Sequence, residues 1–137
     1  MMWALRTFAR STARLVAAVP KEFAISGDDV RYVTEFVDSL FPMNPEGYNF
    51  DFFVSNADVN NYNLEAISVP TLIAHTQDDQ LASHEASQRA ADRIPGARFV
   101  SLKSGGHLML GQQKKNGDTL AAFLAERSDR RAERVAS

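Results

Sequence analysis

The pattern of hydrophobic positions differs between the two halves of the chain. Over residues 26–41, apolar side chains recur at helical spacing, and Ser26 stands where a helix N-cap is favoured. Asp28 and Asp29 follow it, where the positive end of the helix dipole favours acidic residues. Pro42 then ends the pattern. These features predict one amphipathic helix in the first half.

Strand-like and helix-like patterns alternate in the second half. Residues 69–75 form a short, almost wholly apolar run, which is typical of a buried parallel strand. A polar turn over residues 76–83 leads to a helix over residues 84–93, which Ser83 can cap. A second strand is expected over residues 97–102. This order predicts two parallel strands joined by a crossover helix, the unit of an α/β fold.

The helices of this half are expected to cover the sheet. In the crossover helix, Ala86 and Ala90 are expected to face inward. A last helix is expected to start near residues 116–118. It would bury three apolar side chains, those of Leu120, Phe123 and Leu124. Because two parallel strands bury poorly by themselves, we expect this half to be the end of a larger sheet.

The remaining segments are less regular. Residues 1–20 hold three arginines spaced four apart, the last being Arg14, and no acidic residue, as an organellar transit peptide does. We interpret them instead as a helix with a solvated arginine face, and keep targeting as the alternative. Residues 43–66 show no clear period and are predicted to form a loop. Residues 127–137 are mostly charged residues and alanine, which predicts a solvated or frayed tail.

Composition limits the class of protein. A chain of 137 residues predicts one domain, and 15 basic against 17 acidic residues give a formal net charge of -2. That balance lacks the basic excess of a nucleic-acid binder. The absence of cysteine excludes disulfides, thiolate nucleophiles and cysteine-ligated zinc, and it fits a reducing cytoplasm. No apolar run approaches the ~20 residues that span a bilayer, so we expect no membrane partner.

Candidate chemistry lies where the two predicted strands end. Asp78 and Asp79 follow the first strand, and His107 follows the second, directly after Gly105 and Gly106. Neighbouring parallel strands bring their carboxyl ends to one rim of a sheet, where α/β proteins bind ligands. A carboxylate that accepts a hydrogen from one ring nitrogen fixes the imidazole tautomer and leaves the other nitrogen free to act as a base. We therefore expect a carboxylate–imidazole pair at this rim.

Three motifs follow one another within residues 67–111: Val-Pro-Thr-Leu-Ile before an Asp-Asp pair, Ile-Pro-Gly-Ala-Arg before the next strand, and Gly-Gly-His after it. In their order and spacing, these motifs resemble the C-terminal part of an α/β-hydrolase-fold protein. The resemblance implies that residues 1–66 are a helical cap or lid-like segment. It implies further that residues 67–126 are the C-terminal part of the hydrolase parallel sheet, followed by the charged tail of residues 127–137.

The same resemblance implies an activity and two roles. Asp79 matches the acid of the catalytic triad and His107 matches its general base, whereas Asp78 is expected to order its own turn. The parent activity is hydrolysis of an ester, thioester, amide or related carbonyl bond in a small-molecule substrate, with no cofactor or metal. The chain departs from the family at Thr76, where a glycine is usual.

The nucleophile of the family is missing from the sequence. The family places a serine in a Gly-x-Ser-x-Gly turn upstream of the acid, but no two of the seven glycines are four positions apart. An Asp–His pair without nucleophile or oxyanion hole cannot carry out acyl transfer by the family mechanism. We therefore predict a C-terminal fragment of a serine hydrolase that is inactive alone, with Asp79 orienting His107 toward a serine outside this chain.

A non-catalytic binding or assembly module is the alternative function. An open sheet edge would favour pairing with a second copy of the chain, as a homo-oligomer, or with a complementing N-terminal segment. The alternative differs from the first hypothesis in requiring no chemistry of Asp79 or His107.

Several further side chains have two interpretations. We interpret His75 as a structural donor and His84 as solvated, with a zinc site of His75, Asp79 and His107 as the less favoured alternative. Seven side chains could line an acyl or aromatic pocket, although local packing is the favoured interpretation: Phe41, Met43, Tyr48, Phe50, Phe52, Phe53 and Met109.

Overall fold

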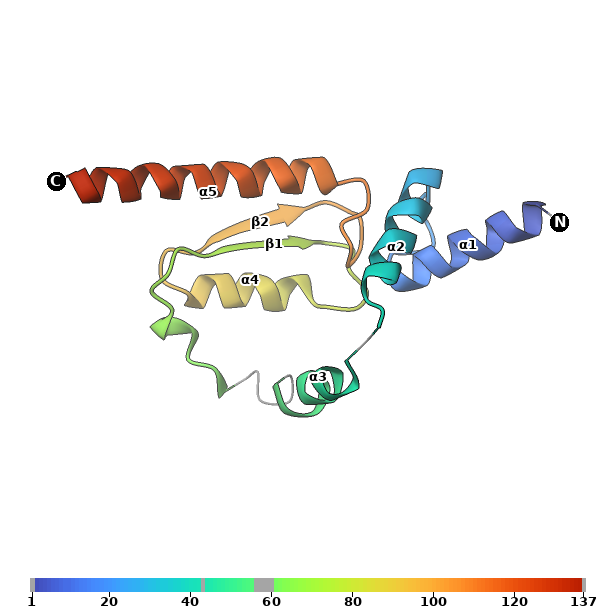
Figure 1. The fold of residues 1–137 in the computed structure, drawn as a ribbon, viewed down its shortest axis with the longest axis horizontal. Helices are drawn as coiled ribbons and strands as arrows, with labels where there is room; N and C mark the ends of the chain where they lie inside the picture. Colours follow the sequence, from blue (N-terminus) through green and yellow to red (C-terminus); the bar gives the residue numbers. More distant parts are fainter. Residues whose placement is uncertain (1, 43, 56–60, 137) are drawn as a thin grey trace.

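Helices surround a small parallel sheet in the computed structural model of the chain, which gives the molecule α/β character (Figure 1). The structure describes residues 2–42, 44–55 and 61–136. α4 (His84–Arg93) lies along one face of the sheet and α5 (Gln113–Ala136) lies along the other. α1 (Met2–Val16) and α2 (Gly27–Ser39) pack together beside the carboxyl ends of the strands.

The two strands and the helix between them form the predicted crossover unit. β1 (Leu72–Thr76) and β2 (Arg98–Leu102) pair in parallel over their whole length. β1 begins at residue 72 rather than at residue 69, because Val69 is exposed and Pro70 has no backbone N–H for a strand ladder. Both strands therefore end at one rim, next to α1 and α2.

Two helices begin where the sequence indicates. At α2, the Ser26 hydroxyl accepts from the N–H of Asp29, whose carboxylate accepts from the N–H of Ser26, so the two residues form a capping box. Ser83 caps α4 through the N–H of Ala86. The prediction that Ala86 faces inward is wrong, because Ala86 is exposed, whereas Ala90 is partly buried and Ala91 is buried.

α5 begins earlier than predicted, and its backbone is helical to its end. It begins at Gln113 rather than near residues 116–118 and continues through Ala136, over the segment where a solvated or frayed tail was expected. Alanine, arginine and glutamate have high helix propensity, and Lys114 pairs with Asp118 one turn later, so the sequence itself favours the longer helix.

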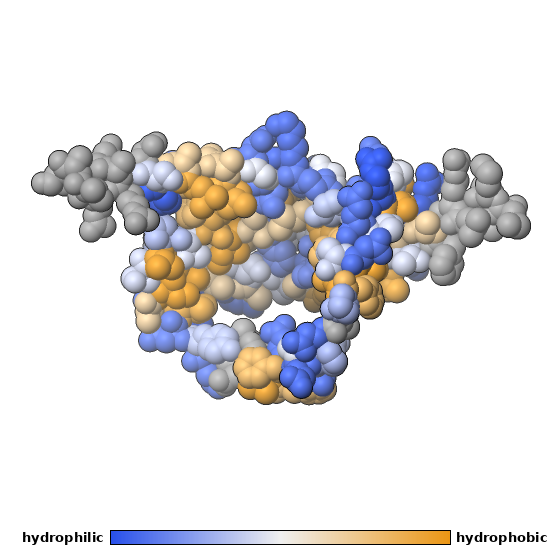
Figure 2. All heavy atoms as spheres, in the orientation of Figure 1, coloured by the Kyte–Doolittle hydropathy of each residue, from blue (hydrophilic) through white to orange (hydrophobic). Residues whose placement is uncertain are grey.

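Fewer apolar side chains of α5 are buried than expected. Phe123 is buried under Arg98 of β2, whose guanidinium lies over the ring and also pairs with Glu126. The prediction that Leu120 and Leu124 are buried is wrong, since both are about half exposed. Figure 2 shows hydrophobic residues at the surface between α5 and the segment before β1. The sheet layer therefore leaves apolar surface open to solvent.

The segment predicted to be a loop contains helical structure. It forms α3 (Pro45–Phe50), a π-helical turn (Asp51–Ser55) and a 3-10 turn (Leu64–Ala66). Asn44 caps α3 by accepting from two N–H groups of the first turn, and proline occupies the first helical position, where its missing N–H costs nothing. The Asn44–Pro45 pair is thus the start of a helix.

The main buried cluster joins the two halves of the chain. Its members come from α1, α2, the turns beside them and the loop after β2: Ala13, Ala17, Val19, Ile25, Val33 and Leu110. Because Leu110 belongs to the second half, the helical first segment packs directly against the loop that follows β2. The division of the chain near residue 67 is therefore bridged by one core.

The predicted solvated arginine face of α1 is found at Arg10, which is exposed, but not at Arg14. The guanidinium of Arg14 turns back and donates to the carbonyl oxygens of Pro20 and Phe23, which follow the helix. Within the described residues, every helix is too short or too polar to cross a bilayer.

Burial predicts different costs for two leucine substitutions. The Leu102 side chain at the end of β2 is 0% exposed, whereas Leu124 on α5 is 55% exposed. We expect Leu102→Ala to lower the free energy of unfolding by about 2–5 kcal/mol and Leu124→Ala to change it by less than about 0.5 kcal/mol. Urea unfolding followed by circular dichroism measures both, and equal losses would contradict this assignment of the core.

Candidate functional site

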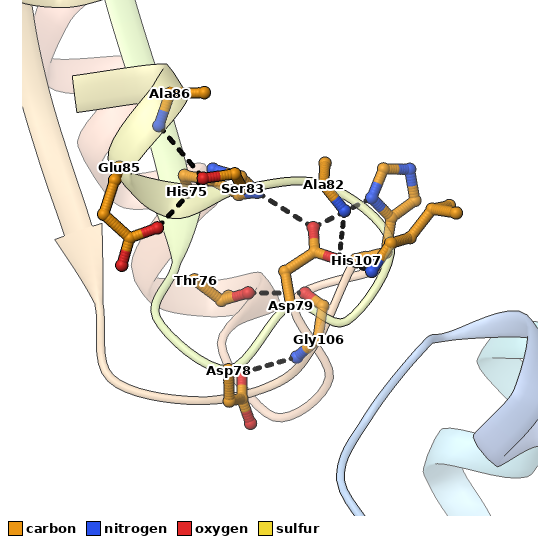
Figure 3. A network of polar contacts seen from close by, with 11 residues as sticks. His75, Thr76, Asp78, Asp79, Ala82, Ser83, Glu85, Ala86, Gly106 and His107 are labelled. Atoms are coloured by element: carbon orange, nitrogen blue, oxygen red, sulfur yellow. Dashed lines mark hydrogen bonds and ion pairs between the residues drawn. The ribbon is translucent and has the colours of Figure 1, made fainter. Parts of the chain in front are cut away.

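The Asp79 carboxylate and the His107 imidazole meet at the rim where the strands end. Asp79 lies in the turn after β1, and His107 lies in the loop after β2. Asp79 Oδ2 is 2.9 Å from His107 Nδ1, which is hydrogen-bond distance (Figure 3). The structure thus brings these two side chains together, and their catalytic roles stay predictions.

The side chain of Asp79 is fully buried, and each of its carboxylate oxygens accepts two hydrogen bonds. Oδ1 accepts from the N–H groups of Leu81 at 2.8 Å and Ala82 at 3.1 Å. Oδ2 lies 2.9 Å from His107 Nδ1 and 2.8 Å from His75 Nε2. Burial alone raises the pKa of this carboxyl, but the four hydrogen bonds outweigh burial and lower the pKa from 3.8 to about 2. Asp79 is therefore a carboxylate at neutral pH.

The charge on Asp79 fixes the tautomers of both histidines. A carboxylate only accepts hydrogen bonds, so the ring nitrogens that face it carry hydrogens, namely Nδ1 of His107 and Nε2 of His75. In a neutral His107 the other nitrogen, Nε2, then carries a lone pair. The His107 side chain is 42% exposed. This ring can accept a proton at Nε2 while Asp79 stabilises the positive charge that results.

Asp78 holds the loop that carries His107. Its two oxygens accept from the backbone N–H groups of Gly105 at 3.1 Å and Gly106 at 2.9 Å. The prediction that Asp78 orders its own turn is wrong, because Asp79 binds the N–H groups of that turn. Thr76, which stands where the α/β-hydrolase pattern has glycine, donates its buried hydroxyl to the Gly106 oxygen at 2.8 Å. Two side chains from the first strand end thus fix the second loop.

The turn after α1 holds both rim loops through its backbone. The Ala17 oxygen accepts from the N–H of His107 at 2.7 Å, and the Ala18 oxygen accepts from the N–H of Gln80 at 3.1 Å. Leu110 anchors the same loop in the main buried cluster. Sequence reasoning missed this contact, because carbonyl groups of alanines carry no side-chain signal.

His75 and His84 lie closer to the site than the sequence predicts. His75 bonds Asp79 directly, and its place at the end of β1, one residue before the polar turn, is the signal that could have identified it. His84, predicted to be solvated, is partly buried. Its ring lies 5.2 Å from that of Phe99, and its Nε2 lies 2.9 Å from the Ser101 hydroxyl. As the first residue of α4, His84 thus contacts β2 and remains partly open to solvent.

A hollow of about 310 Å³ opens beside His107. Its other lining residues are neutral: Tyr32, Leu108, Met109, Gln113, Asn116 and Gly117. None of them is a serine, threonine or cysteine. Among the residues that the structure describes, no group of three acidic or histidine side chains is arranged to hold a metal ion.

The aromatic side chains after α2 do not line this hollow. Four of them are more than half exposed, around α3 or just before it: Phe41, Tyr48, Phe50 and Phe53. Met43 and the side chain of Phe52 lie outside the described part of the structure. Figure 2 shows an opening between the segment that contains α3 and the rest of the molecule. That these side chains pack locally stays a prediction.

The likeness of this chain to known proteins is distant. No family model matches the chain, and no curated protein matches it. Among solved structures, one similar chain is described as an N-acyl homoserine lactone degrading enzyme, with a TM-score of 0.49 and 22% identity. The match covers 87% of this chain and 48% of that enzyme, so this chain spans about half of the enzyme's length.

Gly106 and Gly96 offer a matched pair of glycine substitutions. Gly106 has a φ of +61°, and a Cβ there would overlap the Ala17 oxygen and the Val19 side chain. Gly96 has a φ of +70° with open space around it. We expect Gly96→Ala to lower the free energy of unfolding by about 1–2 kcal/mol, and Gly106→Ala to lower it further and to shift the NMR signals of the His107 ring. Equal losses with an unchanged His107 would contradict the close approach.

The low pKa of Asp79 predicts an acid-sensitive part of stability. Because the pKa of about 2 in the folded chain lies below the ordinary 3.8, the carboxylate stabilises the fold above pH 3.8, and this contribution disappears as the pH falls through about 2. The shift corresponds to about 2 kcal/mol. In urea unfolding, we expect the stability advantage of the wild type over Asp79→Asn to shrink by this amount between about pH 5 and about pH 2. An advantage that does not vary with pH would contradict the assignment.

Proposed function

We propose that this chain supplies the acid–base pair of a serine hydrolase of the α/β-hydrolase type, with His107 as general base and Asp79 as the acid that orients it. The supporting observation is the 2.9 Å contact between Asp79 Oδ2 and His107 Nδ1. The contact assigns the hydrogen of a neutral imidazole to Nδ1 and leaves Nε2 as the acceptor of a proton. The substrate class is a small molecule with an ester, thioester, amide or related carbonyl bond.

The proposed mechanism moves one proton through His107. As a serine oxygen attacks the carbonyl carbon of the substrate, the serine hydroxyl gives its proton to Nε2. The ionised Asp79 stabilises the imidazolium, which then gives the proton to the leaving group as the scissile bond breaks. Water takes the place of the serine in the second half of the reaction and releases the acyl group from the enzyme. A fully buried carboxylate suits this role, because weak solvent screening strengthens its interaction with the imidazolium.

In this proposal the serine and the oxyanion donors belong to a segment outside residues 1–137. The hollow beside His107 has no serine in its lining. Within the described residues the sheet has two strands, each of which is paired on one side. A complementing segment would add strands at an open edge and bring its serine to the rim, with residues 1–66 as the cap. We expect the 137-residue chain to be inactive without it.

The open sheet edge also favours a second candidate function, that of a non-catalytic assembly module. Unpaired strand edges are sites of pairing with another chain, and the apolar surface at Leu120 and Leu124 on α5 lies open beside the sheet. Two measurements on the 137-residue chain distinguish the two functions: sedimentation, and an esterase assay in the presence of a complementing segment. A stable homodimer would favour the assembly module, whereas a chain that gains esterase activity with a complementing segment would favour the hydrolase.

Two substitutions test the acid–base pair in the assembled enzyme, which is this chain together with the complementing segment that supplies the serine. We expect His107→Ala and Asp79→Asn each to lower kcat for p-nitrophenyl acetate on the order of 10⁴-fold, because the first removes the base and the second holds the imidazole in the wrong tautomer. His84→Ala is the control, since His84 bonds Ser101 rather than Asp79. If His107→Ala keeps wild-type turnover, the proposed role of His107 is wrong.

A further inference from the structure

His75 is a buried histidine that bonds the acid but belongs to no part of the triad pattern. Its side chain, at the end of β1, is 10% exposed. Nε2 lies 2.8 Å from Asp79 Oδ2 (Figure 3). The other ring nitrogen, Nδ1, is buried and has no hydrogen-bond partner among the described residues. Among the described residues, Asp79 is therefore the hydrogen-bond partner of the His75 ring.

The unpaired nitrogen makes this position costly for a histidine. A buried polar atom without a partner costs about 1–3 kcal/mol. A phenylalanine would fill a similar volume without this cost, and would pack equally well beside the ring of His84, 5.9 Å away. What a phenylalanine lacks is the hydrogen that Nε2 donates to Asp79. The donor function is therefore what distinguishes His75 from an apolar residue here.

The two oxygens of Asp79 are held by different parts of the fold. Oδ1 is held by the N–H groups of Leu81 and Ala82, which belong to the turn itself. Oδ2 is held by His75, whose backbone is paired with β2. Without His75, the partner of Oδ2 would be His107, on a partly exposed loop. The carboxylate plane could then rotate together with the imidazole that it has to orient.

We infer that His75 is a positioning residue of the acid–base pair, an inference that rests on the proposed function. By donating Nε2–H, His75 ties Asp79 Oδ2 to the sheet, so that Nδ1–H of His107 meets its acceptor in one orientation. One carboxylate oxygen has two lone pairs and can accept from both rings. His75 acts through Asp79 and not on the substrate.

Three variants of His75 separate the donor from the volume of the ring. His75→Gln places an amide N–H near the position of Nε2, within reach of Asp79. His75→Asn places its amide near the position of Nδ1, out of reach of the carboxylate, and His75→Phe keeps a ring without a donor. His84→Phe is the matched control, because the neighbouring His84 ring bonds Ser101. Urea unfolding identifies the variants that fold.

Nitrogen-15 NMR of the 137-residue chain measures the tautomer of His107 directly. We expect the Nδ1–H form to predominate in the wild type, in His75→Gln and in His84→Phe. We expect the Nε2–H form to gain population in His75→Phe and His75→Asn, because Asp79 is then free to rotate. In the assembled enzyme, these two variants are expected to lower kcat for p-nitrophenyl acetate on the order of 10²-fold, with KM little changed and with His75→Gln restoring most of the loss.

Two results separate this inference from the proposed function. Folded His75→Phe and His75→Asn variants with the wild-type tautomer and kcat would overturn the positioning role, since the N–H groups of Leu81 and Ala82 would then hold Asp79 alone. If one variant does not fold, the other decides. Failure of the proposed function appears instead as turnover that persists in His107→Ala, whereas the tautomer of His107 is measured without any turnover.

Discussion

A fully buried carboxylate is the constraint on which the rim of this molecule depends. Removing a charge from water costs several kcal/mol unless hydrogen bonds replace the lost solvation. Asp79 obtains these bonds from three places: its own turn, the end of β1 and the loop after β2. These segments have to converge for the charge to be stable, and their convergence is what forms the Asp79–His107 pair. The same hydrogen bonds therefore serve the fold and the proposed chemistry.

The rest of the scaffold restrains the loop of His107 from two sides. From the sheet, Asp78 binds two successive backbone N–H groups and Thr76 binds the Gly106 oxygen. From the helical side, the Ala17 oxygen binds the N–H of His107, and Leu110 enters the core shared with α1 and α2. The first segment of the chain thus supports the site directly, in addition to any role as a cap. A general base needs such support because small displacements of a reacting group reduce rates strongly.

Local signals in the sequence predict local structure here, and contacts between distant segments escape them. Ser26 and Ser83 identify helix starts, and the apolar runs identify both strands, because capping and burial depend on neighbouring residues. The support from Ala17 could not be predicted, because a carbonyl group is common to every residue. The contact of Asp78 with the loop after β2 escaped prediction too, since two adjacent carboxylates give the same pattern. Leu120 and Leu124 lie open although their spacing indicates burial, which fits a sheet that is completed by another segment.

The tautomer of His107 at neutral pH, measured by nitrogen-15 NMR in the wild type and in Asp79→Ala, tests the central claim most directly. If Asp79 orients the imidazole, Nδ1 carries the hydrogen in the wild type, and removal of the carboxylate shifts the population toward the Nε2–H form. A wild-type ring with its hydrogen on Nε2, or a tautomer ratio that Asp79→Ala leaves unchanged, would contradict the account.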